Sequence, residues 1–313
     1  MSLAGPSSSA RPSPKQSRDR ETMPGDIGAI KSAPHPVVLL TGASAGIGAA
    51  LARELVRRKK ARALVLTARR SARLDQLAAE LRALDHELEV LTIAADLSEP
   101  ATPERLLAET IARFGGLDVL INNAGLGLPT LFAGSLPEHL AQQLTVNFTA
   151  PLMLTRLCLP TLIERKGMII NIGSAITCVA NSALGAYGAT KAGLAYWNDA
   201  LRRELYSKGV TVCLVEPGPI KTEFMDALSA LVPAGKQTHP ILDNAAPWMT
   251  ADVDLVVRRV VDLFDHPRRR LSILRRFVWP FRILGAIARI CPPLGDRVVR
   301  LMQRENQETR EPT

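Results

Sequence analysis

A glycine-rich turn between an apolar run and a helix-forming run is the feature that most constrains this chain. Residues 37–40 are apolar and half β-branched, as expected for a parallel strand buried on both faces of a sheet. Gly42, Gly46 and Gly48 follow, and strong helix formers begin at Ala49. This order leaves free backbone N–H groups and the positive end of a helix at one point, where a pyrophosphate would bind. The spacing G-x-x-x-G-x-G differs from the common dinucleotide fingerprint, so a turn without a ligand stays an alternative.

After the turn, apolar strands alternate with amphipathic helices, which predicts a doubly wound parallel α/β sheet with helices on both faces. In such a sheet, ligands bind beyond the carboxyl ends of the strands. Strands are expected at residues 63–67, 88–94, 119–121, 168–172, 210–215 and 270–274, and helices at residues 72–84, 103–114, 137–164 and 186–207.

Length and composition indicate one large domain with tails. At 313 residues and 47% hydrophobic content, the chain can bury a full core. We expect this domain over residues 37–274, after a Ser- and Pro-rich tail at residues 1–36 that is expected to be disordered. The tail has no apolar run of a secretory signal, which favours a cytoplasmic protein, with an organelle transit peptide as the alternative. The four cysteines are far apart and lack metal-ligand spacing, so neither a metal site nor disulfides are expected.

The net charge of +9 comes from one segment of the chain. Residues 268–304 contain ten arginines and one acid, Asp296, which also sums to +9, so the remainder of the chain is neutral. A nucleic-acid partner is not expected, because its basic footprint would be spread over the domain.

The basic segment forms an amphipathic extension at residues 275–313. Arg275, Arg282 and Arg289 recur seven residues apart among aromatic and aliphatic side chains. Two interpretations stay open. The extension is either a cap on the substrate cleft or on a partner subunit, or an anchor to a membrane surface through residues 275–302.

A tyrosine and a lysine share one helix face after the expected strand at residues 168–172. Tyr187 and Lys191 are four residues apart, and Ser174 closes that strand. In isolation such a pair is more often a surface pair with a solvated lysine. The serine before it and the nucleotide turn upstream favour an active site instead.

Six motifs, in matching order and spacing, resemble those of the short-chain dehydrogenase/reductase family over roughly residues 37–266. The resemblance implies a Rossmann-type fold and hydride transfer between a nicotinamide nucleotide and a carbonyl or alcohol, and a homodimer is expected. The motifs are TGASAGIG at residues 41–48, NNAG at residues 122–125, Asn147, Ser174, the pair Tyr187-x-x-x-Lys191, and PGPIKT at residues 217–222.

The resemblance assigns the catalytic reaction to four side chains. Tyr187 is expected to act as acid/base, and Ser174 to hydrogen-bond the substrate oxygen. Lys191 would hold the nicotinamide ribose and lower the tyrosine pKa. Lowering that pKa from about 10 by about 3 units takes roughly 4 kcal/mol, which one ammonium at about 4 Å supplies. Asn147 would hold a water that links Lys191 to solvent, although a buried asparagine in a kinked helix is an alternative.

The nucleotide is expected to be NADP, with NAD less favoured. A carboxylate at the end of the second strand normally holds the ribose 2′-OH of NAD, and residues 65–71 contain none. Arg69, which precedes Arg70, is expected to bind a 2′-phosphate instead. Ala45 stands where some NADP-preferring members of the family carry a basic residue, so the preference could be incomplete.

The remaining nucleotide contacts are implied by the same resemblance. Asp96 would contact the adenine, and residues 123–125 the adjacent ribose. The full set expected to bind the nucleotide is Gly42, Ser44, Ala45, Gly46, Ile47, Gly48, Arg69, Asp96, Leu97, Asn123, Ala124, Gly125, Tyr187, Lys191, Pro217, Gly218, Ile220 and Thr222.

The substrate-facing segment is expected at residues 224–249, which are rich in apolar side chains and poor in charges. This favours a lipophilic substrate, such as a steroid, retinoid or acyl-chain carbonyl. We therefore expect an NADP-dependent oxidoreductase acting on C=O or CH–OH groups. The alternative is a non-catalytic dinucleotide-binding regulator or scaffold at a membrane surface, against which the presence of Ser174, Tyr187 and Lys191 argues.

Overall fold

The computed structural model describes residues 35–178, 180, 184–220 and 251–273, together with residues 282, 283, 285, 286, 290 and 293. Its strands are β1 (Val37–Thr41), β2 (Ala63–Ala68), β3 (Glu89–Ala94), β4 (Val119–Asn122), β5 (Met168–Ile172), β6 (Thr211–Glu216) and β7 (Arg270–Ser272). They form one seven-stranded sheet in the order β3-β2-β1-β4-β5-β6-β7, and each pairing is parallel. The predicted doubly wound parallel sheet is confirmed.

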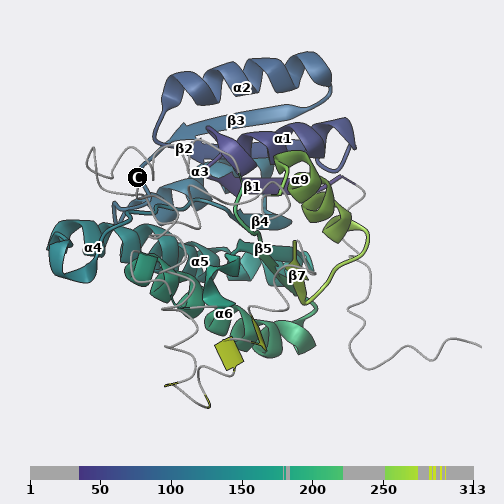
Figure 1. Ribbon diagram of the computed structural model, residues 1–313. Coiled ribbons are helices and arrows are strands. Elements are labelled where there is room, and N and C mark those ends of the chain that lie inside the picture. Colours follow the sequence, from purple (N-terminus) through teal and green to yellow (C-terminus); the bar gives the residue numbers. More distant parts are fainter. Residues whose placement is uncertain are drawn as a thin grey trace, which may run out of the picture.

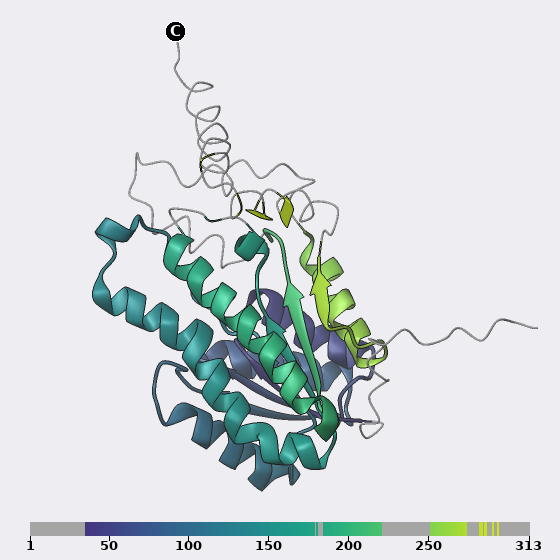
Figure 2. The same cartoon turned by 90° about the horizontal axis from the view of Figure 1, so that it is seen from below.

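Helices cover both faces of this sheet (Figures 1 and 2). On one face lie α1 (Gly46–Arg57), α2 (Ser71–Leu84) and α9 (Val253–Val261), whose buried side chains share one apolar cluster. On the other face lie α3 (Thr102–Phe114), α5 (Ala150–Glu164) and α6 (Gly185–Leu205), which share a second cluster.

The central strand β1 shows why its sequence is continuously apolar. Val38 and Leu40 belong to the cluster that contains α1 and α9, whereas Val37 and Leu39 belong to the cluster that contains α5 and α6. All four side chains are fully buried. Because successive side chains of a strand point to opposite faces, a strand covered on both sides needs apolar residues at every position.

The sheet order reverses next to β1, which pairs with β2 on one side and with β4 on the other. The chain leaves β1 for α1 on one face, and it leaves β4 for α5 on the opposite face. This is the topological switch point at which ligands of doubly wound sheets bind. The glycine turn follows β1, and Asn123, Ala124 and Gly125 follow β4, so both motifs lie there.

One predicted helix is interrupted. Residues 137–164 form α4 (Pro137–Leu144), the π-helical turn η2 (Thr145–Thr149) and α5 rather than one regular helix. The extra residue of a π-helical turn re-aims the neighbouring side chains, and such turns are frequent at functional sites. Asn147 lies at the middle of η2 and is fully buried.

By length and composition, the span Pro137–Glu164 is apolar enough to cross a membrane. However, Leu154, Cys158 and Leu162 of this span pack against the sheet in the second apolar cluster, and each is at most 1% exposed. The span is therefore a core element of the domain.

Several sequence-based expectations lie outside the described residues. The tail is described only at residues 35 and 36, and residues 221–250 and 274–281 are not described. The disordered tail, the domain boundary at residue 274 and the apolar segment at residues 224–249 therefore stay predictions. Within the described ranges, Cys158, Cys178 and Cys213 are free thiols, and no group of His, Cys, Asp or Glu is placed to hold a metal ion.

Candidate active site

The turn after β1 is shaped for close approach of a ligand to the backbone. Gly42 and Gly46 have φ angles of +67° and +53°, in the left-handed region that side chains disfavour. A Cβ added at Gly48 would overlap the carbonyl oxygen of Gly42, so α1 packs on the turn at a distance that only glycine allows. The N-cap residue Ala45 provides no capping side chain, which leaves the first-turn N–H groups to bind an anion such as pyrophosphate.

The glycine turn is tied directly to the end of β4. Thr41 Oγ1 accepts hydrogen bonds from the backbone N–H groups of Asn123 and Ala124, each at 3.0 Å. Asn123 Nδ2 donates to the carbonyl oxygen of Thr41 at 2.9 Å. A Cβ added at Gly42 would lie 2.8 Å from the Cα atom of Ala124. Thr41 was not among the predicted site residues, although a threonine that ends an apolar strand was a visible signal.

Arg70 is the arginine that contacts the glycine turn. Its Nε and Nη2 atoms donate to Ser44 Oγ at 3.3 Å and 3.1 Å. Arg69, which the sequence favoured as the phosphate ligand, is exposed, and its role stays a prediction. A guanidinium beside a ring of backbone N–H groups suits a nucleotide that carries an additional phosphate.

The third strand end contributes Asp96 and Leu97. Asp96 Oδ1 accepts hydrogen bonds from the backbone N–H and the hydroxyl of Ser98, both at 2.8 Å, so this oxygen stabilises a local turn. Leu97 packs, partly buried, against the second apolar cluster. The contact of Asp96 with adenine and the nucleotide contact of Leu97 stay predictions.

The segment after β6 lies beside the segment after β5. The carbonyl oxygen of Pro217 accepts a hydrogen bond of 2.8 Å from the backbone N–H of Ala175, the residue after Ser174. Gly218 and Ile220 follow Pro217, and Thr222 lies outside the described residues.

Ser174, Tyr187 and Lys191 come together at the carboxyl end of β5. Lys191 is 3% exposed, and its Nζ atom donates to the carbonyl oxygen of Ile172 at 2.9 Å. Tyr187 lies one turn earlier on α6, and its ring centre is 5.9 Å from Lys191 Nζ. A hydrogen bond joins the side chains of Tyr187 and Ser174. The structure therefore brings together three residues that span 17 positions of the sequence, from Ser174 to Lys191.

Asn147 reaches the same place from η2. Its Oδ1 accepts from the N–H of Leu126 at 2.7 Å, and its Nδ2 donates to the carbonyl oxygen of Leu126 at 2.7 Å and to Thr190 Oγ1 at 3.2 Å. A Cβ added at Gly125 would lie 3.7 Å from both Asn147 Oδ1 and Lys191 Nζ. Asn147 thus secures the loop after β4 against α6, and its predicted part in a proton relay stays a prediction.

Burial sets the pKa values of the two titratable groups at this site. It raises the pKa of Tyr187 to about 12, which the hydrogen bond with Ser174 offsets only in part. It lowers the pKa of Lys191 to about 8. The expectation that Lys191 lowers the pKa of Tyr187 is therefore wrong for this structure. The reason is that desolvation by burial dominates at the phenol.

A chain of buried amides fixes α6 against the sheet. Asn122 Nδ2 donates to Thr155 Oγ1 at 3.1 Å and to Asn171 Oδ1 at 2.8 Å, and Asn171 Nδ2 donates to Asn198 Oδ1 at 2.9 Å. These bonds link β4, β5, α5 and α6, and Asn198 is two helical turns beyond Lys191. Because buried polar groups need partners, this chain of amide side chains holds α6 in one register against the sheet. The sequence analysis missed it, although Asn171 stood out within an apolar strand.

The sequence model of the family described as short chain dehydrogenase matches residues 36–231. The chain belongs to this family. The six sequence motifs therefore lie in the doubly wound fold that the resemblance implied.

Two curated relatives of this short-chain dehydrogenase are similar over most of the domain. Serine 3-dehydrogenase from Rhizobium radiobacter is 38% identical over 188 residues, which cover 60% of this chain and 73% of that protein. Ketoacyl reductase HetN from Nostoc sp. is 34% identical over 267 residues, which cover 84% of this chain and 88% of that protein.

Solved structures show the same similarity. A short-chain dehydrogenase from Sphingobium yanoikuyae in complex with NADPH has a TM-score of 0.67 at 30% identity, covering 85% of this chain and 95% of that one. An actinorhodin polyketide ketoreductase with NADPH has a TM-score of 0.70 at 25% identity, covering 78% and 97%. Family and relatives alike identify this short-chain dehydrogenase as an oxidoreductase of hydroxyl and carbonyl groups.

The burial of Lys191 predicts a pH dependence of stability. Its pKa is about 8 in the folded protein, against 10.5 for an exposed lysine. Between these values the unfolded chain binds the additional proton, so the free energy of unfolding should rise with pH, by up to about 3 kcal/mol. Lys191→Met removes the titrating group, and urea unfolding of both proteins between pH 8 and 10 measures the difference. Parallel pH curves for the two proteins would contradict this assignment.

Proposed function

We propose that this short-chain dehydrogenase uses NADP to transfer a hydride between nicotinamide and the carbonyl or alcohol of a lipophilic substrate, with Tyr187 as the acid/base. The single observation that carries the proposal is the meeting of Ser174, Tyr187 and Lys191 beside the glycine turn. The shared hydrogen bond of Tyr187 with Ser174 and the buried ammonium of Lys191 support these roles.

The residues around the switch point suit NADP. The N–H groups at the start of α1 would hold the pyrophosphate, and Arg70, supported by Ser44, would hold the 2′-phosphate. Two structural relatives are described as complexes with NADPH, which supports the same choice. The lack of a carboxylate at residues 65–71 argues against a preference for NAD.

When bound, NADPH supplies the hydride that reaches the carbonyl carbon. Tyr187 donates its phenolic proton to the carbonyl oxygen, and Ser174 hydrogen-bonds that oxygen. Because burial raises the pKa of Tyr187 to about 12, the phenol carries its proton near neutral pH, which is the form that carbonyl reduction requires. Lys191 would hold the ribose hydroxyls. In the oxidising direction, the tyrosinate would accept the proton of the alcohol.

An apolar recess near α6 supports a lipophilic substrate. A cavity of about 220 Å³ is lined by Leu128, Phe132, Ala186 and Ala189, among others, at the end of α6 that carries Tyr187. Phe132 is 78% exposed, so this end of the protein offers apolar surface to a ligand. The alternative, a non-catalytic nucleotide sensor, would not need the serine, tyrosine and lysine together.

We propose a cytoplasmic homodimer that binds peripherally to anionic membranes. Met153 on α5 and Tyr196 on α6 are exposed, which offers apolar surface for a second copy. In the C-terminal extension, Ile283 and Ile290 are 46% and 85% exposed and are seven residues apart, close to two helical turns. The arginines of residues 275–302 complement anionic headgroups.

Tyr187→Phe tests the acid/base role. The variant loses only a hydroxyl, so its melting temperature and NADPH affinity should be retained, while turnover of ketones falls at least about a hundredfold. Tyr206→Phe, an exposed tyrosine at the C-terminal end of the same helix, is the matched control and should keep normal turnover. Steady-state kinetics with a ketone panel measure both; near-normal turnover of Tyr187→Phe would remove Tyr187 from the mechanism.

Arg69→Ala and Arg70→Ala test the choice of nucleotide. Loss of a charge-assisted hydrogen bond to the 2′-phosphate costs roughly 1.5 to 3 kcal/mol, so the phosphate ligand should lose NADPH affinity by about tenfold or more. NADH affinity should hardly change, because NADH lacks that phosphate. Fluorescence titration with both nucleotides identifies which arginine binds it. Equal losses for NADPH and NADH would contradict a phosphate role.

Vesicle sedimentation tests the membrane proposal. Binding to anionic vesicles should exceed binding to neutral ones and weaken only partly as salt rises, because apolar burial is not screened. Ile283→Gln combined with Ile290→Gln should reduce binding to both kinds of vesicle, since it removes exposed apolar side chains and adds no charge. If the unmodified protein sediments with neither kind of vesicle, the anchor interpretation is wrong.

A further inference from the structure

Glu216, the last residue of β6, is a buried carboxylate held by three donors. Its side chain is 1% exposed. Arg270 Nη1 donates to Oε1 at 3.1 Å, Ser272 Oγ donates to Oε2 at 2.8 Å, and Arg282 Nη2 donates to Oε2 at 2.6 Å. Arg270 and Ser272 are the first and last residues of the edge strand β7. Arg282, in contrast, belongs to the C-terminal extension. A buried carboxylate requires such partners, because removing one leaves part of its charge uncompensated.

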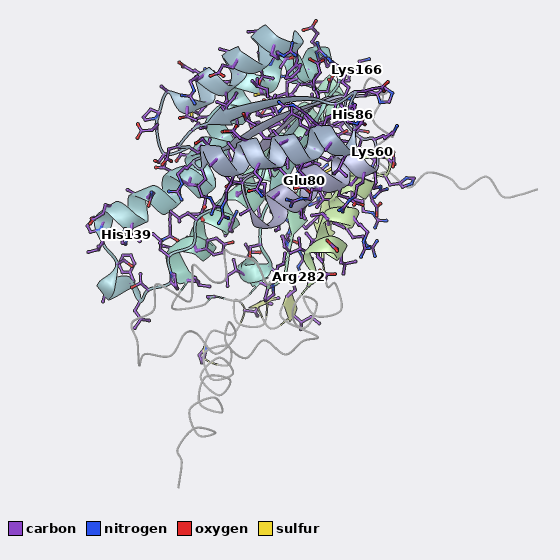
Figure 3. All side chains as sticks on the ribbon, turned by 90° about the horizontal axis from the view of Figure 1, so that it is seen from above. Lys60, Glu80, His86, His139, Lys166 and Arg282 are labelled. Carbon is purple, nitrogen blue, oxygen red and sulfur yellow. The ribbon has the colours of Figure 1, made fainter. Side chains whose placement is uncertain are left out.

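The extension touches the catalytic segment at a second point. Gly285 lies so close to Cys178 that an added Cβ would overlap the Cys178 carbonyl oxygen. The guanidinium of Arg282 also acts on the thiol of Cys178, where it partly offsets the rise in pKa that burial causes. Arg282 and Gly285 are three residues apart in helical backbone and therefore share one face, whereas Ile283 and Ala286 are exposed. Figure 3 shows Arg282 on the side of the molecule away from Lys166, which lies just before β5.

Both contact points, at Glu216 and at Cys178, are connected to the segment that carries Ser174. Cys178 ends the short helix η3 (Ala175–Cys178), which begins directly after Ser174. The N–H of Ile176 in η3 donates to Ser174 Oγ at 3.2 Å. At its other end, η3 is held by the bond from the Ala175 N–H to the carbonyl oxygen of Pro217, the residue after Glu216. The position of the Ser174 hydroxyl thus depends on η3, and η3 is held by the end of β6 and by the extension.

We propose that the ion pair of Arg282 with Glu216 latches the C-terminal extension onto the catalytic domain, and that Arg282, Glu216 and Gly285 are positioning residues for Ser174. Arg282 and Gly285 of the extension then cover η3, whereas Ile283 and Ala286 stay exposed and available for the membrane. The proposal rests on the catalytic role proposed for Ser174.

Hydrogen exchange tests the latch without a substrate. In Arg282→Gln, the amides of Ala175–Cys178 should exchange at least about tenfold faster than in the unmodified protein, while amides of α5 keep their rates. Arg282→Lys keeps a positive charge and should restore most of the protection. Arg53→Gln is the matched control, because Arg53 pairs with Glu80, outside the network around Glu216. Unchanged exchange of Ala175–Cys178 in Arg282→Gln would overturn the latch.

Kinetics distinguish positioning from general stabilisation. With the ketone that the unmodified protein reduces fastest, Arg282→Gln should lose roughly tenfold in kcat, with NADPH affinity nearly unchanged, and Arg282→Lys should recover most of the lost kcat. Faster exchange without a change in kcat would overturn the positioning role while leaving Tyr187 unaffected. Equal losses of kcat and of NADPH affinity would indicate a general structural role instead.

Gly285→Ala is a second and independent variant, because it changes no charge. The added methyl group would displace the extension from Cys178, so it should accelerate exchange of the same amides. Gly185→Ala is its control, since an added Cβ there meets no atom within 4 Å. Identical exchange in Gly285→Ala and the unmodified protein would contradict the packing of the extension on η3.

Discussion

The contact between the glycine turn and the end of β4 is the constraint on which the site depends. Thr41, buried at the end of β1, receives the N–H groups of Asn123 and Ala124, and Gly42 lies against Ala124 with no room for a side chain. The two halves of the sheet are therefore held together at the switch point itself. Because Gly48 packs equally closely on Gly42, the start of α1 is brought to the same place. A larger side chain at either glycine would separate the nucleotide cradle from the strands that carry catalysis.

Burial gives the catalytic side chains their chemistry. Lys191 is held within the protein by the carbonyl oxygen of Ile172, and desolvation brings its pKa to about 8. The same effect keeps Tyr187 protonated, with a pKa of about 12. A group that is removed from water must have polar partners, which here come from the end of β5 and the residues after it: Ile172 for Lys191 and Ser174 for Tyr187. The apolar packing of α5 and α6 against the sheet makes this dehydrated site possible.

Local sequence determined the element types and the family. A continuous apolar run before Gly42 predicts a strand covered on both faces, and the alternation of strands and helices predicts a parallel doubly wound sheet. Both follow from side-chain periodicity, which is a local property of the chain. The pair of Tyr187 and Lys191 could also be found, since helical spacing alone places both on one face. Ser174 was recognised because it lies just beyond the end of a strand, after Gly173.

Tertiary structure decided which residues meet and what their surroundings do to them. Three hydrogen bonds join residues that are far apart in the sequence. Arg70 and Ser44 are 26 positions apart, Asn171 and Asn198 are 27 apart, and Arg282 and Glu216 are 66 apart. Periodicity carries no information about such distances. The pKa of Tyr187 was mispredicted for the same reason: charge spacing along a helix could be read from the sequence, but desolvation depends on the packing of the whole domain around the phenol.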